Sequence, residues 1–211
     1  MDFSAERIAL IQNLRTEIRD ERVLKAMARV PREEFIPAGL KHAAYVDRAF
    51  PIGSDQTISQ PTIVAMMTEA LELKGQEKVL EVGTGSGYQT AIIAEIADKV
   101  VTVERHRELL EGAQEVLTRL GYGNIEFHLS TDVLGWPEGA PYDAIVVTAG
   151  APSIPQGLLD QLTFGGRLVI PVGSRYEQDL VRLTRHRGEC ITRSLGACRF
   201  VPLIGEGAWS E

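Results

Sequence analysis

The stretch VLEVGTGSGYQT, residues 79–90, passes from an apolar run into a glycine-rich turn and then into a segment with helical patterning. Its glycines are Gly83, Gly85 and Gly87. A turn of this kind at the carboxyl end of a first strand lies beside the point where open α/β sheets bind ligands. Glycines let the backbone approach a ligand closely, and the following helix offers free N–H groups. The stretch therefore predicts a nucleotide-binding α/β sheet.

The chain on both sides of this turn has the pattern of that fold. Near-continuous apolar strands that alternate with helices indicate a parallel sheet covered on both faces, the doubly wound Rossmann-like arrangement. After Gly173 the pattern changes to that of antiparallel strands, which we expect to close the sheet. The expected strands are 79–83, 100–104, 125–130, 142–150, 166–173, 179–186, 189–194 and 197–203, and the expected helices are 87–98, 107–122 and 155–162.

The N-terminal part has a different pattern and is predicted to be helical. A first helix is expected over 4–20, with Ser4 as a possible N-cap, and a second after Asp20 that ends at Pro31. Residues 31–61 indicate a long ordered loop region, and such loops are usually functional. A third helix is expected over 61–73. We therefore predict a helical segment with an active-site loop over 1–74, packed on a nucleotide-binding core over 75–211 as a single compact unit.

Composition narrows the function classes. The 211 residues carry a net charge of −7, which argues weakly against nucleic-acid binding. No apolar run approaches the roughly 18 residues that a membrane span needs, and the first residues lack the apolar core of a signal peptide. Cys190 and Cys198 lack metal-ligand spacing and are expected to be reduced thiols. A cytoplasmic protein with no metal, no membrane and no nucleic-acid partner is expected.

The spacing of the turn bears on the cofactor. A dinucleotide site typically has G-x-G-x-x-G, but this chain has G-x-G-x-G, with Tyr88 where the third dinucleotide glycine would stand. Glu81, two residues before the turn, suits a ligand with a positive ammonium group and is a poor neighbour for a pyrophosphate. Glu104, at the end of the next strand, is placed to accept hydrogen bonds from ribose hydroxyls. These carboxylates favour S-adenosylmethionine (SAM) over NAD.

The segment after the fourth core strand bears on the methyl acceptor. Amino-group methyltransferases commonly place an Asn/Asp-Pro-Pro-aromatic segment there, whereas this chain has Thr148-Ala149-Gly150-Ala151-Pro152. A cytosine methyltransferase needs a nucleophilic cysteine near a strand end at the site, and both cysteines lie in the C-terminal strands. Nitrogen and cytosine acceptors are therefore disfavoured.

Several motifs together resemble the protein-L-isoaspartate (D-aspartate) O-methyltransferase family, in family order across most of the chain. TISQP joined to GTGSGYQT is the most specific combination. The matching blocks are AM..VPR..FIP (26–37), PIG..QTISQP (51–61), VLEVGTGSGYQTA (79–91), APYDAIVVTA (140–149), IP..L..QL..GGRLVIPVG (154–173) and RFVPL (199–203).

The resemblance implies a repair enzyme for damaged proteins or peptides. It implies transfer of the SAM methyl group to the α-carboxylate of L-isoaspartyl residues, with S-adenosyl-L-homocysteine as the second product. The ester then cyclises to a succinimide without the enzyme, and hydrolysis returns some normal aspartate. A carboxylate with a pKa near 4 is ionised at pH 7, so no strong general base is required. We accordingly expect His42, His106, His128 and His186 to be structural or surface residues. The chain is expected to be a monomer.

The resemblance also implies roles for individual residues. Ser59 matches the active-site serine of the family, although a Ser before Pro61 is also a common N-cap. RFVPL is expected to form a strand edge beside the site, with core packing an equally good reading of its side chains. The substrate-binding candidates are Ile52, Gly53, Phe200 and Pro202. The cofactor-binding candidates are Thr57, Ile58, Gln60, Glu81, Gly83, Thr84, Gly85, Gly87, Glu104, Thr131, Asp132 and Val133.

Two departures from the family pattern keep alternatives open. Thr131-Asp132-Val133 stands where Gly-Asp-Gly is usual, and Asp55 stands where a glycine is common. Asp tolerates a left-handed backbone better than most residues, so the loop can keep its shape. The main alternative is a SAM-dependent O-methyltransferase of the same fold that acts on another carboxylate. An NAD-linked oxidoreductase and a non-catalytic SAM-binding module are the others.

Overall fold

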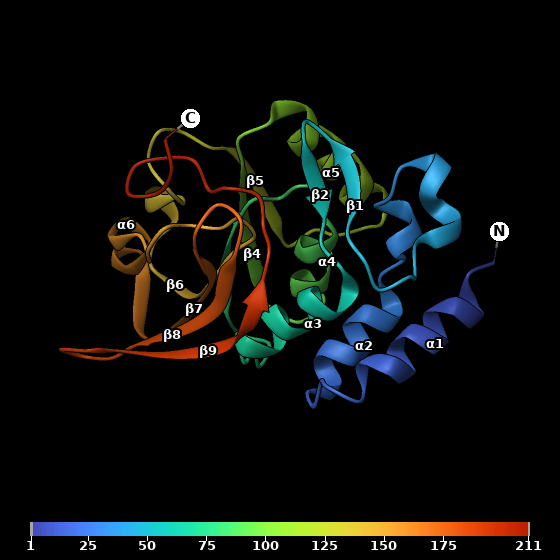
Figure 1. The fold of residues 1–211 in the computed structure, drawn as a ribbon, viewed down its shortest axis with the longest axis horizontal. Coiled ribbons are helices and arrows are strands. Elements are labelled where there is room, and N and C mark those ends of the chain that lie inside the picture. The colour runs from blue at the N-terminus through green and yellow to red at the C-terminus, as the bar shows by residue number, and fades with distance from the viewer. Residues whose placement is uncertain (1, 211) are drawn as a thin grey trace.

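A seven-stranded sheet in the order β5-β4-β3-β6-β7-β8-β9 forms the centre of the computed structural model, which describes residues 2–210 (Figure 1). Strands β3 to β7 are parallel, and β8 and β9 continue the sheet in antiparallel pairing. The predicted mostly parallel sheet with antiparallel closing strands is confirmed. The strands are β3 Lys78–Val82, β4 Lys99–Glu104, β5 Ile125–Leu129, β6 Tyr142–Val147, β7 Leu162–Gly173, β8 Gln178–Arg185 and β9 Cys190–Cys198.

Helices cover both faces of the parallel part, which explains why its strands are apolar at nearly every position. On one face, Val79 and Val100 pack with residues of α3 and α4. On the other face, Leu80 and Val101 pack with Leu158 of α6. The helices concerned are α3 Pro61–Ala70, α4 Tyr88–Ala94, α5 Arg107–Arg119 and α6 Gln156–Asp160.

The N-terminal segment contains α1 Ser4–Leu14 and α2 Glu21–Arg29. Helix α2 packs against α3 and α4, and α1 packs on α2 at the outside (Figure 1). The prediction of one helix over 4–20 is wrong at its end, and Phe3 rather than Ser4 is the N-cap. The predicted start of the second helix is confirmed, because the Asp20 side chain accepts a hydrogen bond from Arg22 N.

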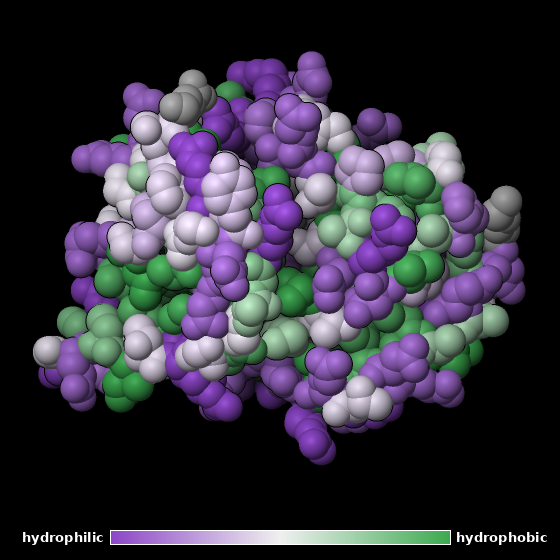
Figure 2. Space-filling model, in the orientation of Figure 1, coloured by the Kyte–Doolittle hydropathy of each residue, from purple (hydrophilic) through white to green (hydrophobic). Residues whose placement is uncertain are grey.

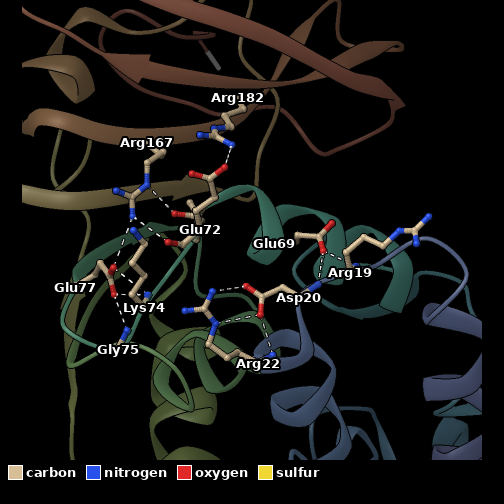
Figure 3. Close-up of polar contacts among 11 residues, drawn as sticks. Arg19, Asp20, Arg22, Glu69, Glu72, Lys74, Gly75, Glu77, Arg167 and Arg182 are labelled. Carbon is tan, nitrogen blue, oxygen red and sulfur yellow. Dashed lines mark hydrogen bonds and ion pairs between the residues drawn. The ribbon is translucent and has the colours of Figure 1, made fainter.

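A carboxylate on α3 holds the segment between α1 and α2. One oxygen of Glu69 accepts the backbone N–H groups of Arg19 and Asp20, at 2.6 and 2.7 Å. Figure 3 shows Glu69 beside these two residues. A second cluster lies apart from it, after the end of α3, where Arg167 binds the Leu71 carbonyl and Arg182 binds the Glu72 carboxylate. The contact of Glu69 with the two N–H groups therefore fixes the backbone that leads from α1 into α2.

The region 31–61 is more regular than the expected loop. It contains the 3₁₀ helices η1 Arg32–Glu34 and η2 Ala38–Ala43, followed by a hairpin of β1 Phe50–Gly53 and β2 Gln56–Ile58. Ser54 and Asp55 form its turn with φ of 49° and 56°. Positive φ at both central residues matches the twist of a two-residue hairpin. The expectation that Asp55 accepts a left-handed backbone is confirmed.

The segment RFVPL, in contrast, is not part of a strand, because β9 ends at Cys198, and the predicted strand edge is reduced to a parallel bridge between Gly150 and Pro202. Phe200 N donates to the Gln178 side chain at 2.8 Å instead of to a neighbouring strand. Gly150 N then donates to Val201 O at 2.7 Å, and Leu203 N donates to Gly150 O at 2.8 Å. We call residues 199–204 the C-terminal strap, because these bonds hold it across the end of β6.

The surface is mostly polar. The face in Figure 2 is largely hydrophilic, and its hydrophobic side chains gather in separate areas. In the part of the chain that the structure describes, no helix combines the length and the apolar character that a bilayer crossing requires. The large exposed hydrophobic residues are Ile8, Val46, Val133, Phe164, Tyr176 and Ile191.

The two carboxylates at the end of α3 lead to a stability prediction. Charge-assisted hydrogen bonds contribute about 1.5–3 kcal/mol, and neutral ones about 0.5–1.5 kcal/mol. We therefore expect Glu69→Gln to lower the free energy of unfolding by about 1–2 kcal/mol in urea titrations. Glu72, 56% exposed and paired with Arg182, is the matched control, and Glu72→Gln should cost less than about 1 kcal/mol. Equal losses would contradict the role given to Glu69.

Candidate functional site

A cavity of about 410 Å³ opens at the carboxyl ends of β3, β4 and β6. The chain order in the sheet reverses between β3 and β6, which is the position where open α/β sheets bind ligands. The hairpin strand β2 and the strap complete the wall. The predicted residues that line it are Thr57, Ile58, Ser59, Gly83, Thr84, Gly85, Glu104, Thr131, Val133 and Pro202.

The other predicted residues lie outside the cavity lining. The hairpin residue Ile52 has its Cδ1 3.5 Å from where a Cβ of Gly85 would stand, so it supports the turn from behind. The sequence gives no means of separating residues that face the cavity from residues that hold those in place, so both roles stay predictions. The set outside the lining is Ile52, Gly53, Gln60, Glu81, Gly87, Asp132 and Phe200.

Two glycines of the turn are required for different reasons. Gly83 has φ of 100°, and a Cβ there would meet Thr148 Oγ1 at 2.2 Å. Gly87 has φ of 86°, and a Cβ there would lie 3.0 Å from Leu117 and 3.1 Å from Ala113. Gly83 therefore allows β3 to approach β6 at the cavity, whereas Gly87 allows α4 to pack on α5.

Glu104 is held by the backbone on two sides. One carboxylate oxygen accepts Gly85 N at 2.9 Å, and the other accepts His106 N at 3.0 Å. The side chain is buried and lines the cavity. Because each carboxylate oxygen has two acceptor sites, Glu104 retains capacity for hydroxyl donors of a ligand.

Glu81 lies behind the wall and is completely buried. One oxygen accepts the hydroxyls of Thr90 and Thr102 at 2.5 and 2.7 Å. The other oxygen has no hydrogen-bond partner among the described residues. Burial, with a smaller contribution from the Glu104 charge, outweighs these hydroxyls and raises the pKa of Glu81 to about 8. Glu104 fits a ligand that carries hydroxyl groups, and a positive charge in the cavity would favour ionisation of the Glu81 carboxyl behind it.

Ser59 lines the cavity directly after β2, two residues before the start of α3, and is half-buried. The N-cap alternative is wrong, because the N-cap position is Gln60 and the cap contact comes from another residue. The Asp47 carboxylate accepts Thr62 N at 2.8 Å and the Thr62 hydroxyl at 2.7 Å. The Ser59 hydroxyl has no partner among the described residues and is free to bind a ligand.

Some cavity residues were not found from the sequence. His106 was expected to be structural or on the surface, but it lines the cavity two residues after Glu104. Thr148 also lines it and donates to Gly83 O at 2.6 Å. Both follow the carboxyl end of a parallel strand, where α/β sheets bind ligands. This position in the sequence could have identified them as candidate site residues. Within residues 2–210, no group of His, Cys, Asp and Glu is arranged to hold a metal ion.

Comparisons with known proteins address the identity of this site. A family profile described as protein-L-isoaspartate(D-aspartate) O-methyltransferase matches residues 5–208. The protein-L-isoaspartate O-methyltransferase of Syntrophus aciditrophicus is 51% identical over 216 residues, 99% of this chain and 98% of that protein. A solved structure named protein-L-isoaspartate O-methyltransferase aligns with a TM-score of 0.84 and 29% identity, over 96% of this chain and 67% of that chain.

A further solved structure carries a ligand. It is a Plasmodium falciparum chain described as a protein-L-isoaspartate O-methyltransferase in complex with S-adenosyl-L-homocysteine. It aligns with a TM-score of 0.79 and 26% identity, over 92% of this chain and 96% of that chain. The fold, the switch-point cavity and these neighbours define a class I SAM-dependent methyltransferase. Within that class, the chain belongs to the protein-L-isoaspartate(D-aspartate) O-methyltransferase family.

Burial of Glu81 leads to a pH prediction. A carboxyl whose pKa is near 4.5 in the unfolded chain and about 8 in the folded chain binds its proton more tightly when folded. Its contribution to stability is therefore complete below pH 4.5 and is lost as the pH rises through 8. Urea titrations across this range should show that Glu81→Gln removes this decline. A decline of the same size in the variant would contradict the assignment to Glu81.

Proposed function

We propose that the cavity is the active site of a repair methyltransferase for L-isoaspartyl residues in damaged proteins and peptides. The unpartnered Ser59 hydroxyl, on the wall that also contains the glycine turn and Glu104, is the observation that carries this proposal. Family membership supports the same substrate class and does not favour another carboxylate.

The first task of the site is to bind the cofactor. When bound, SAM supplies a methyl group on a positively charged sulfur. Glu104 would accept hydrogen bonds from ribose hydroxyls. Glu81 would lie behind the glycine turn, where the positive charge of a bound ammonium group favours the ionised form of its carboxyl. The backbone of the turn at Gly83 and Gly85 permits close approach of such a ligand. Asp132, between the lining residues Thr131 and Val133, would accept a hydrogen bond from the adenine amino group, as the family resemblance implies.

The substrate side requires orientation more than acid–base chemistry. The α-carboxylate of an isoaspartyl residue is already ionised near neutral pH, so no proton has to be removed before attack. Ser59 would donate a hydrogen bond to one carboxylate oxygen and aim the other at the methyl carbon. The new O–CH₃ bond forms as the S–CH₃ bond breaks, and S-adenosyl-L-homocysteine leaves. Holding the reacting atoms in line supplies much of the rate.

A pair of peptides tests the assignment directly. With labelled SAM, we expect base-labile methyl incorporation into an L-isoaspartyl peptide and none into the matched L-aspartyl peptide. Base lability identifies an ester, and the pair identifies the acceptor carboxylate. Incorporation into neither peptide, with SAM binding established by calorimetry, would refute the isoaspartyl assignment.

The role of Ser59 can be separated from helix capping. A hydrogen bond to a charged group contributes about 1.5–3 kcal/mol, so Ser59→Ala should lower kcat/KM by about 10- to 100-fold. Its free energy of unfolding should change by less than about 0.5 kcal/mol, because Asp47 provides the cap. Asp47→Ala is the reciprocal control, with an expected stability loss of about 1 kcal/mol. A stability loss in Ser59→Ala equal to that of Asp47→Ala would contradict this division of roles.

A further inference from the structure

Arg32 is completely buried, although arginine is seldom found in protein interiors without a carboxylate. It lies in η1, within the VPR motif. Its guanidinium group donates to three main-chain carbonyls: Nε to Ala44 at 2.9 Å, Nη2 to Ser59 at 2.8 Å, and Nη2 to Arg48 at 3.5 Å. One side chain therefore joins η1, the end of η2 and the loop that carries Ser59.

The same guanidinium group also contacts the cofactor side of the cavity. Its central carbon lies 4.6 Å from the centroid of the Tyr88 ring. Tyr88 is the first residue of α4, directly after Gly87, and it lines the cavity. Arg32 thus contacts the loop that carries Ser59 through a hydrogen bond and the start of α4 through the Tyr88 ring.

This arrangement is costly for the fold. In the part of the chain that the structure describes, no carboxylate lies within ion-pair distance of Arg32, and its Nη1 has no hydrogen-bond partner. Burial lowers the pKa of the guanidinium group. A buried charge without an opposite charge is destabilising unless it is fully hydrogen-bonded. General stability alone does not account for an unpaired cation at this position.

We propose that Arg32 is a positioning residue for methyl transfer, which fixes the Ser59 loop relative to the glycine turn. This inference rests on the proposed role of Ser59. The guanidinium group is planar, so it can bond in its plane and stack through its face at the same time. A lysine ammonium keeps the charge but has one nitrogen in place of the separate Nε and Nη2 donors that bind Ala44 and Ser59. Because Arg32 binds the Ser59 carbonyl, it acts on the substrate through the direction of the Ser59 hydroxyl.

Arg32→Lys is the direct test, measured with the isoaspartyl peptide. A small misplacement of a positioned group is expected to lower kcat/KM by about 10- to 100-fold. Arg7→Lys is the matched control, since Arg7 lies 5.5 Å from the Tyr45 ring centroid and binds Glu33, away from the cavity. The control should retain kcat/KM within about threefold, as expected for a residue with no shared partner.

A double-mutant cycle distinguishes positioning from simple support of the fold. Once Ser59→Ala has removed the hydroxyl, Arg32→Lys should lower kcat/KM further by less than about threefold. Full additivity of the two losses would overturn the proposal, as would an unchanged kcat/KM in Arg32→Lys. Inactivity of the wild-type chain on the peptide, with SAM bound, would instead refute the proposed function.

If Arg32→Lys does not fold, a second variant tests the proposal. Arg32→Gln removes the buried charge and retains a planar donor for the Ser59 carbonyl. In the folded variant, the SAM Kd from calorimetry should change by less than about threefold while kcat/KM falls as above. If both Arg32 variants are unfolded and Arg7→Lys is folded, Arg32 serves general stability and the proposal is overturned.

Discussion

The close approach of Gly83 to Thr148 sets the geometry on which the cavity depends. The Thr148 hydroxyl donates to the carbonyls of Val82 and Gly83 and occupies the space that a side chain at position 83 would need. These contacts join the ends of β3 and β6, the strands between which the sheet order reverses. A larger residue at position 83 would push the two strand ends apart, and the walls that they carry would move with them.

Acidic and basic side chains lie on different sides of the cavity. Two acidic side chains, Glu81 and Glu104, stand on the side of the glycine turn, and the buried cation of Arg32 stands behind Ser59. A positively charged cofactor and a negatively charged acceptor are the ligands that such an arrangement accommodates. The low dielectric of the interior strengthens these interactions over short distances. The acidic side chains and the buried arginine therefore lie on different sides of the cavity, one beside the expected cofactor and the other beside the expected acceptor.

Much of the core could be predicted from the sequence, because strands buried on both faces are apolar throughout and ligand residues follow their carboxyl ends. Other features depend on contacts between distant segments. The backbone at Arg19, between α1 and α2, is bound by Glu69, 50 positions further along the chain. The position of Phe200 depends on the Gln178 side chain, and the need for Gly87 depends on α5. No local pattern records such contacts, and the roles of individual cavity residues stay predictions for the same reason.

The cap that Asp47 provides to α3 has a consequence for how this loop can change. A serine at a helix start commonly caps the helix. If the same serine also binds a substrate, its replacement alters stability and activity together. Here these two duties belong to residues 12 positions apart in the chain. Position 59 is therefore a point at which selection, or a protein engineer, can vary the reactive group while the scaffold stays constant.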